Sequence, residues 1–359
     1  MLNFTVGPVM SCTEVREVAG EQIPYFRTDE FSKVMLENEL LLKSFFKAKT
    51  SSRVIFMTGS GTASMDAIVL NTLTKEDKIL VINGGSFGHR FCQICDVYDL
   101  NYIEIKCSIG KTLKKDELYK YDGAGYTALL VNLDETSTGV LYDIDMISKF
   151  CKKNNIFLIV DSISSFLCDP FNMTELGVNA VITGSQKALA IAPGISIICV
   201  DEIAINRINR NKIKAYYLDL KPYLSNMERG QTPFTPAVGI LLQLNKRLNM
   251  IKDAGGVENE INKTLARAEY FRDKIKDLPF NIFPDKMSNA VTALTLKNKE
   301  KSAYNVFQIL KDEYNIWVCP NGGDLKDLIF RVGHIGDLST NDYDELIASL
   351  NDLNKRNLI

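Results

Sequence analysis

The chain has 359 residues, of which 46% are hydrophobic and 24% are charged, and its formal net charge at pH 7 is −2. This composition is typical of a globular protein with two domains, and it excludes a strongly basic surface that binds nucleic acid or anionic lipid. No apolar run approaches the roughly 20 residues of a membrane helix, and the first residues lack the pattern of a signal peptide. Eight cysteines are scattered through the chain, so we expect reduced thiols and a cytosolic location.

After an N-terminal arm (residues 1–20), apolar strands and amphipathic helices alternate as far as residue 200. The expected strands are 53–57, 78–82, 101–107, 127–132, 156–160, 180–182 and 195–200. The expected helices are 28–47, 61–73, 87–100 and 143–154. Continuous apolar strands between amphipathic helices predict a mostly parallel sheet that helices cover on both faces.

The pattern changes after residue 200. We expect irregular structure over 212–227, which is rich in Tyr and Lys, and later a helix break at Gly255-Gly256. The remaining expected elements are helices 236–253, 257–276, 302–314 and one from 341, with strands 290–297, 316–319 and 328–332. The predicted domains are therefore a large one (21–255) and a smaller α+β one (256–359).

Lys187 lies in a turn between two of the expected strands, with small and apolar residues on both sides. Lysines usually stay in solvent, and burial of one favours the neutral amine. A neutral amine is a nucleophile that forms a Schiff base with a carbonyl. Lys187 alone leaves open a second interpretation, a loop lysine with its charge in solvent.

Ligands of parallel α/β sheets bind beyond the carboxyl ends of the strands, and several such ends carry polar residues here. The turn Gly59–Ser64 leads into a helix and is either a phosphate cradle or an ordinary turn. It is no dinucleotide fingerprint, because Ser64 stands at the third glycine position. Phe87, between glycines, either faces a planar ring or begins the core face of the next helix.

Two further strand ends add hydroxyl and carboxyl groups. The segment 134–139, which contains Thr136, offers hydrogen-bonding groups to a ligand or forms a capped turn. Asp161 follows an apolar strand, where it caps a helix or pairs with a buried cation such as a protonated pyridine nitrogen. One ligand, pyridoxal 5′-phosphate, matches all of these groups together: a phosphate cradle, a stacking ring, hydroxyls, a carboxylate and a lysine.

The same residues stand in motifs that make the chain resemble a class V aminotransferase of fold type I, over nearly its whole length. The motifs are Gly59-Ser60-Gly61-Thr62, Glu135-Thr136-Ser137-Thr138-Gly139, Val160-Asp161-Ser162, Gly184-Ser185-Gln186-Lys187 and Phe330-Arg331-Val332-Gly333. The chain is similar above all to the alanine/serine–glyoxylate and 2-aminoethylphosphonate–pyruvate branches. The resemblance implies a large domain with a mostly parallel seven-stranded sheet sandwiched by helices, and a smaller α+β C-terminal domain.

The resemblance also implies a role for each matching residue. Lys187 would form the Schiff base with the cofactor and move protons, while Asp161 would pair with the ring nitrogen. The other implied cofactor contacts are Phe87 on the ring face, Thr136 near the ring hydroxyl, and Ser60, Gly61, Thr62 and Gln186 at the phosphate. Thr235 would reach the phosphate of the neighbouring subunit in a homodimer. Arg331 would hold the substrate carboxylate, with Gly7 beside the substrate.

The implied reaction is a ping-pong transfer from 2-aminoethylphosphonate, alanine or serine to pyruvate or glyoxylate. A lyase or decarboxylase with the same cofactor would use the same residues. A nicotinamide-dependent oxidoreductase would leave Lys187 unexplained. Gln186 and Phe87 stand where cysteine desulfurases carry histidines, which argues against desulfuration. Arg27 either binds a second anionic group or is structural, and we expect a structural role for Cys92 and Cys95 and no metal site.

Overall fold

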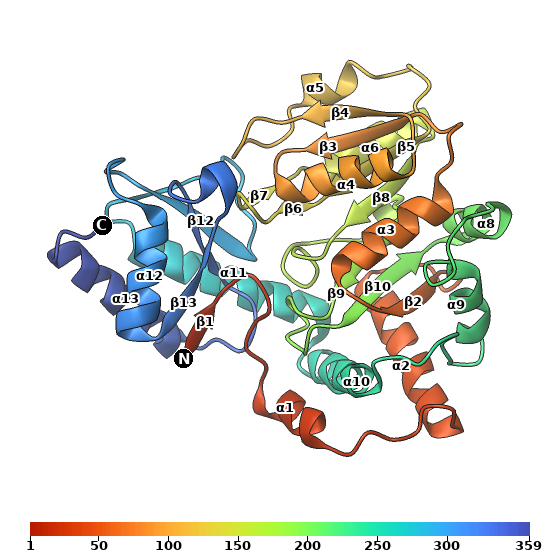
Figure 1. Ribbon diagram of the computed structural model, residues 1–359, viewed down its shortest axis with the longest axis horizontal. Coiled ribbons are helices and arrows are strands. Elements are labelled where there is room, and N and C mark those ends of the chain that lie inside the picture. The colour runs from red at the N-terminus through yellow and green to blue at the C-terminus, as the bar shows by residue number, and fades with distance from the viewer.

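A computed structural model describes residues 1–359, and Figure 1 shows two sheets that lie side by side with helices packed around them. The larger sheet has seven strands in the order β2-β10-β9-β8-β5-β3-β4. Their bounds are β2 (Arg53–Thr58), β3 (Ile79–Asn83), β4 (Tyr102–Lys106), β5 (Ala128–Asn132), β8 (Phe157–Asp161), β9 (Ala180–Gly184) and β10 (Ile195–Val200). All pairs are parallel except those that β10 makes with β2 and β9. This arrangement confirms the predicted mostly parallel sheet.

Helices cover both faces of this sheet because successive strand residues point to opposite sides. In β8, Leu158 and Val160 belong to one hydrophobic cluster, whereas Phe157 and Ile159 belong to the other. The helices in the first cluster include α2 (Asp29–Phe45), α6 (Ile144–Asn154), α7 (Met173–Leu176) and α10 (Val238–Asp253). Those in the second are α3 (Gly61–Thr72), α4 (Ser86–Val97), α8 (Glu202–Arg210) and α9 (Leu220–Met227).

A second sheet of five strands has the order β1-β13-β14-β12-β11. Its strands are β1 (Leu2–Phe4), β11 (Phe280–Ile282), β12 (Val291–Leu296), β13 (Ile316–Pro320) and β14 (Phe330–Gly333). It packs with α11 (Gly256–Lys274), α12 (Ala303–Tyr314) and α13 (Thr340–Lys355) around a third cluster. The expected arm 1–20 contributes β1 to this sheet and also contains α1 (Thr13–Gly20). The arm therefore links the small sheet to the large one.

Four further short elements lie between strands of a single sheet. They are α5 (Lys115–Tyr119), the pair β6 (Asp134–Glu135) and β7 (Val140–Leu141), and the 3-10 turn η1 (Gly323–Leu325). The helix break at Gly255-Gly256 is confirmed, since both glycines have positive φ (104° and 79°) between α10 and α11. The domain boundary at the same place stays a prediction. None of the helices has the length and apolar composition that crossing a membrane requires.

The expectation of irregular structure over 212–227 is confirmed for 212–219, which form no helix or strand, and is wrong for 220–227, which form α9. The side chain of Asp219 caps this helix by accepting a hydrogen bond from the N–H of Lys221 at 3.1 Å. Buried residues at helical spacing, namely Leu220, Tyr223, Leu224 and Met227, then pack it on the large sheet. The high content of Tyr and Lys concealed this apolar stripe.

Replacing Ile182 by Ala tests how strongly the strand before Lys187 depends on its packing. Ile182 lies in β9 and is fully buried, so Ile182→Ala should lower the free energy of unfolding by about 2–5 kcal/mol. Ile203 in α8 is 56% exposed, and the matched Ile203→Ala change should stay within about 0.5 kcal/mol. Urea unfolding measures both variants, and equal losses would contradict the assigned packing.

Candidate active site

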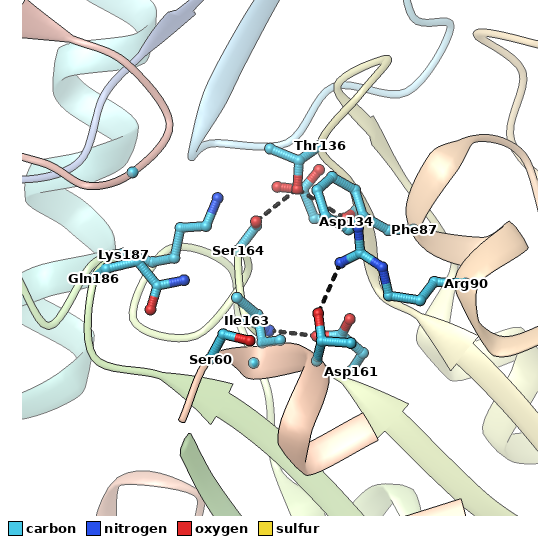
Figure 2. Close-up of a pocket in the computed structure, with 13 residues that line it drawn as sticks. Ser60, Phe87, Arg90, Asp134, Thr136, Asp161, Ile163, Ser164, Gln186 and Lys187 are labelled. Atoms are coloured by element: carbon cyan, nitrogen blue, oxygen red, sulfur yellow. Dashed lines mark hydrogen bonds between the residues drawn. The ribbon is translucent and has the colours of Figure 1, made fainter. Parts of the chain in front are cut away.

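One cavity of about 230 Å³ lies where β8 and β9 end and α3 and α4 begin, and Figure 2 shows the side chains that surround it. Nine of the predicted site residues line it: Gly7, Ser60, Gly61, Thr62, Phe87, Thr136, Asp161, Gln186 and Lys187. All of them except Gly7, which belongs to the N-terminal arm, end or follow strands of the large sheet whose carboxyl ends meet at one edge. Arg331 and Thr235 are not among the lining residues.

Lys187 lies in the turn after β9 and its side chain crosses the cavity, with a relative exposure of 8%. Its Nζ donates a hydrogen bond to the carbonyl oxygen of Val6 in the N-terminal arm. Burial lowers the pKa of the amine, although nearby Asp134 and Asp161, when they are ionised, act against this effect. The structure thus places a readily deprotonated amine inside the cavity.

Gly7 lies directly against Lys187. A Cβ atom at this position would lie 2.7 Å from Cδ of Lys187, and the backbone φ of +114° is unfavourable for other residues. The close approach of the arm therefore depends on glycine at this position.

The N-terminus of α3 faces the cavity through Ser60, Gly61 and Thr62. Ser60 is the N-cap but makes no side-chain cap hydrogen bond, and the first turn of the helix has no acidic residue. Free N–H groups and the helix dipole suit an anion here. Arg90 adds positive charge, since its Nη1 donates to Oγ1 of Thr62 at 3.2 Å.

Two apolar side chains can contact a planar ligand. Phe87 is half-buried in the first turn of α4, and the guanidinium of Arg90 lies 4.9 Å from its ring centroid. Ile163, two residues after β8, lines the same cavity and packs against Gly61, where any Cβ would clash with it. Both residues could contact a planar ring.

Asp161 ends β8 as a buried carboxylate whose Oδ1 accepts from the N–H of Ile163 at 2.8 Å. Burial raises its pKa to about 7, although the hydrogen bond from Ile163 and the charge of Lys187 lower it. Such a carboxylate fits a ligand that brings a protonated nitrogen. Thr136, above it in Figure 2, shares a hydrogen bond of 2.6 Å with the hydroxyl of Ser164.

Arg331 lies in β14 of the small sheet and is buried beside this cavity. Its Nη1 donates to the carbonyl of Thr136 at 2.9 Å and its Nη2 to that of Pro320 at 2.6 Å. Its Nε is buried without a partner. A buried guanidinium with an unsatisfied N–H fits an incoming carboxylate.

The remaining predicted residues lie elsewhere. Thr235 is exposed and outside the cavity, so its role across a subunit interface stays a prediction. Arg27 donates through Nη1 to Oε1 of Gln231 at 3.1 Å and to the carbonyl of Thr232 at 2.8 Å, as a structural arginine does. Cys92 and Cys95 are buried in α4, where burial raises the pKa of each thiol to about 12.

Sequence reasoning missed four residues of the lining: Arg90, Asp134, Ile163 and Ser164. Asp134 was visible as an acid at a strand end, next to the selected Thr136. Ile163 and Ser164 follow Asp161 within three positions, and Arg90 lies one helical turn after Phe87. Proximity to the selected residues was therefore the available signal.

These groups fit pyridoxal 5′-phosphate. The anion site at the start of α3 matches its phosphate, and the two apolar side chains match the faces of its ring. The buried carboxylate of Asp161 matches the ring nitrogen, and the buried amine of Lys187 matches the aldehyde. The predicted role of Arg331 in carboxylate binding stays a prediction, because Arg331 does not line the cavity.

Comparison with known proteins agrees with this assignment. The family model described as aminotransferase class-V matches residues 24–324. An uncharacterized aminotransferase of Methanocaldococcus jannaschii is 33% identical over 337 residues, which cover 92% of this chain and 86% of that protein. An aspartate aminotransferase of subgroup IV from Thermus thermophilus has a crystal structure that matches with a TM-score of 0.91, at 25% identity and 99% coverage of each chain.

Two relatives carry names that specify substrates. The L-aspartate–glyoxylate aminotransferase of Paracoccus denitrificans is 26% identical over 345 residues, which cover 94% of this chain and 86% of that protein. The 2-aminoethylphosphonate–pyruvate transaminase of Vibrio vulnificus is 25% identical over 363 residues, with 97% and 96% coverage. Both similarities extend over nearly the whole chain.

The lowered pKa of Lys187 gives a direct prediction for the chain without added ligand. Its labelling by an amine-selective acylating reagent should reach half its maximum rate at a lower pH than the ordinary lysine value of 10.5, because burial disfavours the charged amine. Peptide mass spectrometry across a pH series measures this, with exposed lysines of the same digest as references. A midpoint equal to theirs would contradict the burial of the amine.

Proposed function

The chain belongs to the class-V aminotransferase family, and we propose that it moves the amino group of a small amine or amino acid to pyruvate or glyoxylate. The proposed cofactor is pyridoxal 5′-phosphate, and the proposed donors are 2-aminoethylphosphonate, alanine and serine. The observation that carries the proposal is the buried amine of Lys187, which shares one cavity with the Asp161 carboxylate and the N-terminus of α3. In the ping-pong order that we propose, the oxo product of the donor leaves before the acceptor binds.

The residues of this chain would divide the binding of the cofactor among them. The N-terminus of α3 with Gln186 would hold the phosphate, and Phe87 with Ile163 would contact the ring. Asp161 would keep the ring nitrogen protonated, since a buried carboxylate is stabilised by a cation at hydrogen-bonding distance. When bound, pyridoxal phosphate supplies an aldehyde for amino groups and a ring that withdraws electrons from the donor α-carbon.

Lys187 would be the catalytic acid and base. Its Nζ, whose pKa is lowered by burial, would accept the proton from the α-carbon of the donor and later return one to the acceptor. The cavity holds few apolar groups besides Phe87 and Ile163, so polar groups surround this amine. The carbonyl of Val6 fixes its direction when no substrate is bound.

Arg331 would hold the carboxylate of the acceptor and of an amino acid donor. Two backbone carbonyls fix its guanidinium, and its buried Nε has no partner that a carboxylate would have to displace. The named donors of relatives, aspartate and 2-aminoethylphosphonate, differ in their anionic groups, and both belong in a donor screen.

We also propose a homodimer in the cytosol. The exposure of Thr235, which the resemblance assigns to the partner's phosphate site, supports the dimer. Eight free cysteines, six of them buried, support a reducing compartment.

The visible absorption spectrum tests the proposal. The protein purified with pyridoxal phosphate should absorb visible light, lose this band with one of 2-aminoethylphosphonate, alanine, serine or aspartate, and recover it with pyruvate or glyoxylate. Lys187→Ala should remove turnover because no other amine lines the cavity, whereas the exposed Lys297→Ala should not. A protein that stays colourless with added pyridoxal phosphate would refute the proposed cofactor. A band that no donor removes would favour a lyase or decarboxylase.

Substitution of Arg331 tests its role in carboxylate binding. Arg331→Lys keeps the charge but loses the planar guanidinium, so kcat/KM for the oxo acid should fall by about tenfold to hundredfold, mainly through KM. Arg27→Lys is the matched control, because Arg27 bonds to Gln231 and Thr232 outside the cavity. Steady-state kinetics with varied acceptor measures both, and equal effects would contradict the assignment.

A further inference from the structure

The mechanism above leaves unused a buried acid in the cavity, Asp134. It belongs to β6, lines the cavity next to Thr136, and is 4% exposed. Its Oδ2 lies 2.9 Å from Oγ of Ser288, while its Oδ1 is buried without any hydrogen-bond partner. A second buried acid, Asp169, places its Oδ2 3.2 Å from the same Ser288 oxygen.

The single hydroxyl proton of Ser288 cannot serve both carboxyl groups. Its oxygen already accepts the N–H of Ala290 at 3.0 Å, so its proton can point to only one of the two acids. If both acids were ionised, one carboxylate oxygen would face a lone pair of Ser288 in a buried site. The contacts are satisfied when one acid is protonated and donates to Ser288, which then donates to the other.

The surroundings decide which acid carries the proton. Asp169 receives a second hydrogen bond, from the N–H of Asn289 at 3.2 Å, and the positive charges of Arg272 and Lys286 act on it. The free Oδ1 of Asp134 receives none, and the charges of Asp169 and Glu135 oppose its ionisation, while the charge of Lys187 favours it. Burial raises the pKa of both acids, that of Asp134 to about 8 and that of Asp169 to about 6.

We propose that Asp134 and Asp169 share one proton through Ser288, with the proton on Asp134 near neutral pH, and that this pair favours the uncharged form of the Lys187 amine. The proton of Oδ2 in Asp134 points to Oγ of Ser288, and the proton of Oγ points to Oδ2 of Asp169. Asp134 then carries no charge beside the cavity. It is a positioning residue that acts through Lys187.

The consequence follows from the charges around Lys187. Cys319, Asp134 and Asp161 favour the charged amine when they are ionised, whereas burial and the charge of Arg331 disfavour it. A neutral Asp134 removes one of the stabilising charges, so the amine stays a base at lower pH. The acid pair also joins the two sheets, since Ser288 precedes β12 of the small sheet.

The pH dependence of Lys187 labelling in the full-length chain, without cofactor or substrate, tests the pair. Asp169→Asn removes the negative neighbour and lets Asp134 ionise, so the midpoint for Lys187 should rise by about one to three pH units. Asp134→Asn mimics the neutral acid and should leave the midpoint nearly unchanged. In the double variant the rise should disappear.

The opposite pattern would overturn the proposal. If Asp134 were ionised in the natural protein, Asp134→Asn would lower the midpoint and Asp169→Asn would hardly change it. Infrared spectroscopy adds a structural readout, since the C=O band of a protonated carboxyl at neutral pH should be weaker in Asp134→Asn, and an unchanged band would also overturn the proposal. If Asp134→Asn failed to fold, the labelling of Lys187 in Asp169→Asn would decide alone. A midpoint that does not rise in this variant would then refute the proposal.

This inference relies on the proposed function only for its effect on catalysis, where Asp169→Asn should move the acidic limb of the kcat/KM profile to higher pH. The labelling result does not depend on transamination. If the labelling pattern is as predicted but aminotransferase activity is absent, the acid pair stands and the proposed function is refuted. If activity is present but the labelling pattern differs, the proposed function stands and the acid pair is refuted.

Discussion

The enclosure of the Lys187 amine is the constraint on which the rest of the site depends. Lys187 loses its water because the arm crosses the end of β9, with the carbonyl of Val6 as hydrogen-bond acceptor and Gly7 in close contact. The arm is held there by β1, which pairs with β13 of the small sheet. The same sheet carries Arg331 in β14. The small sheet therefore fixes both the enclosure of the amine and the position of this buried arginine.

The residues of the site that directly follow an apolar strand, or that begin a helix, could be predicted from the sequence. Continuous apolar runs identified β8 and β9 as buried strands, and residues that follow such strands must gather at one edge of a parallel sheet. Asp161 and Lys187 were found in this way. Thr62 was found because a glycine-rich turn before a helix has free N–H groups at the helix start.

Other parts of the site depend on contacts that no local pattern records. Asp134 lies 154 residues from Ser288, and Asp169 lies 119 residues from it, so their contact follows only from the packing of the two sheets. The position of Arg90 depends on the orientation of α4, which places it over Phe87 and beside Thr62. Thr235 has an assigned role only in a second subunit, which one chain cannot specify.

The buried acids connect the chemistry of the site to the stability of the fold. Burial raises the pKa of Asp134, Asp161 and Asp169 to about 8, 7 and 6, so each binds its proton more tightly in the folded chain than in the unfolded one. The resulting stability is fully present below the ordinary pKa of 3.8 and is lost as the pH rises from there through the folded values of about 6 to 8. A ligand that brings a protonated nitrogen to Asp161 replaces the missing proton there, and Ser288 lets Asp134 keep its own. The buried acids that make this cavity polar thus make the stability of the folded state depend on whether they hold protons or a cationic ligand.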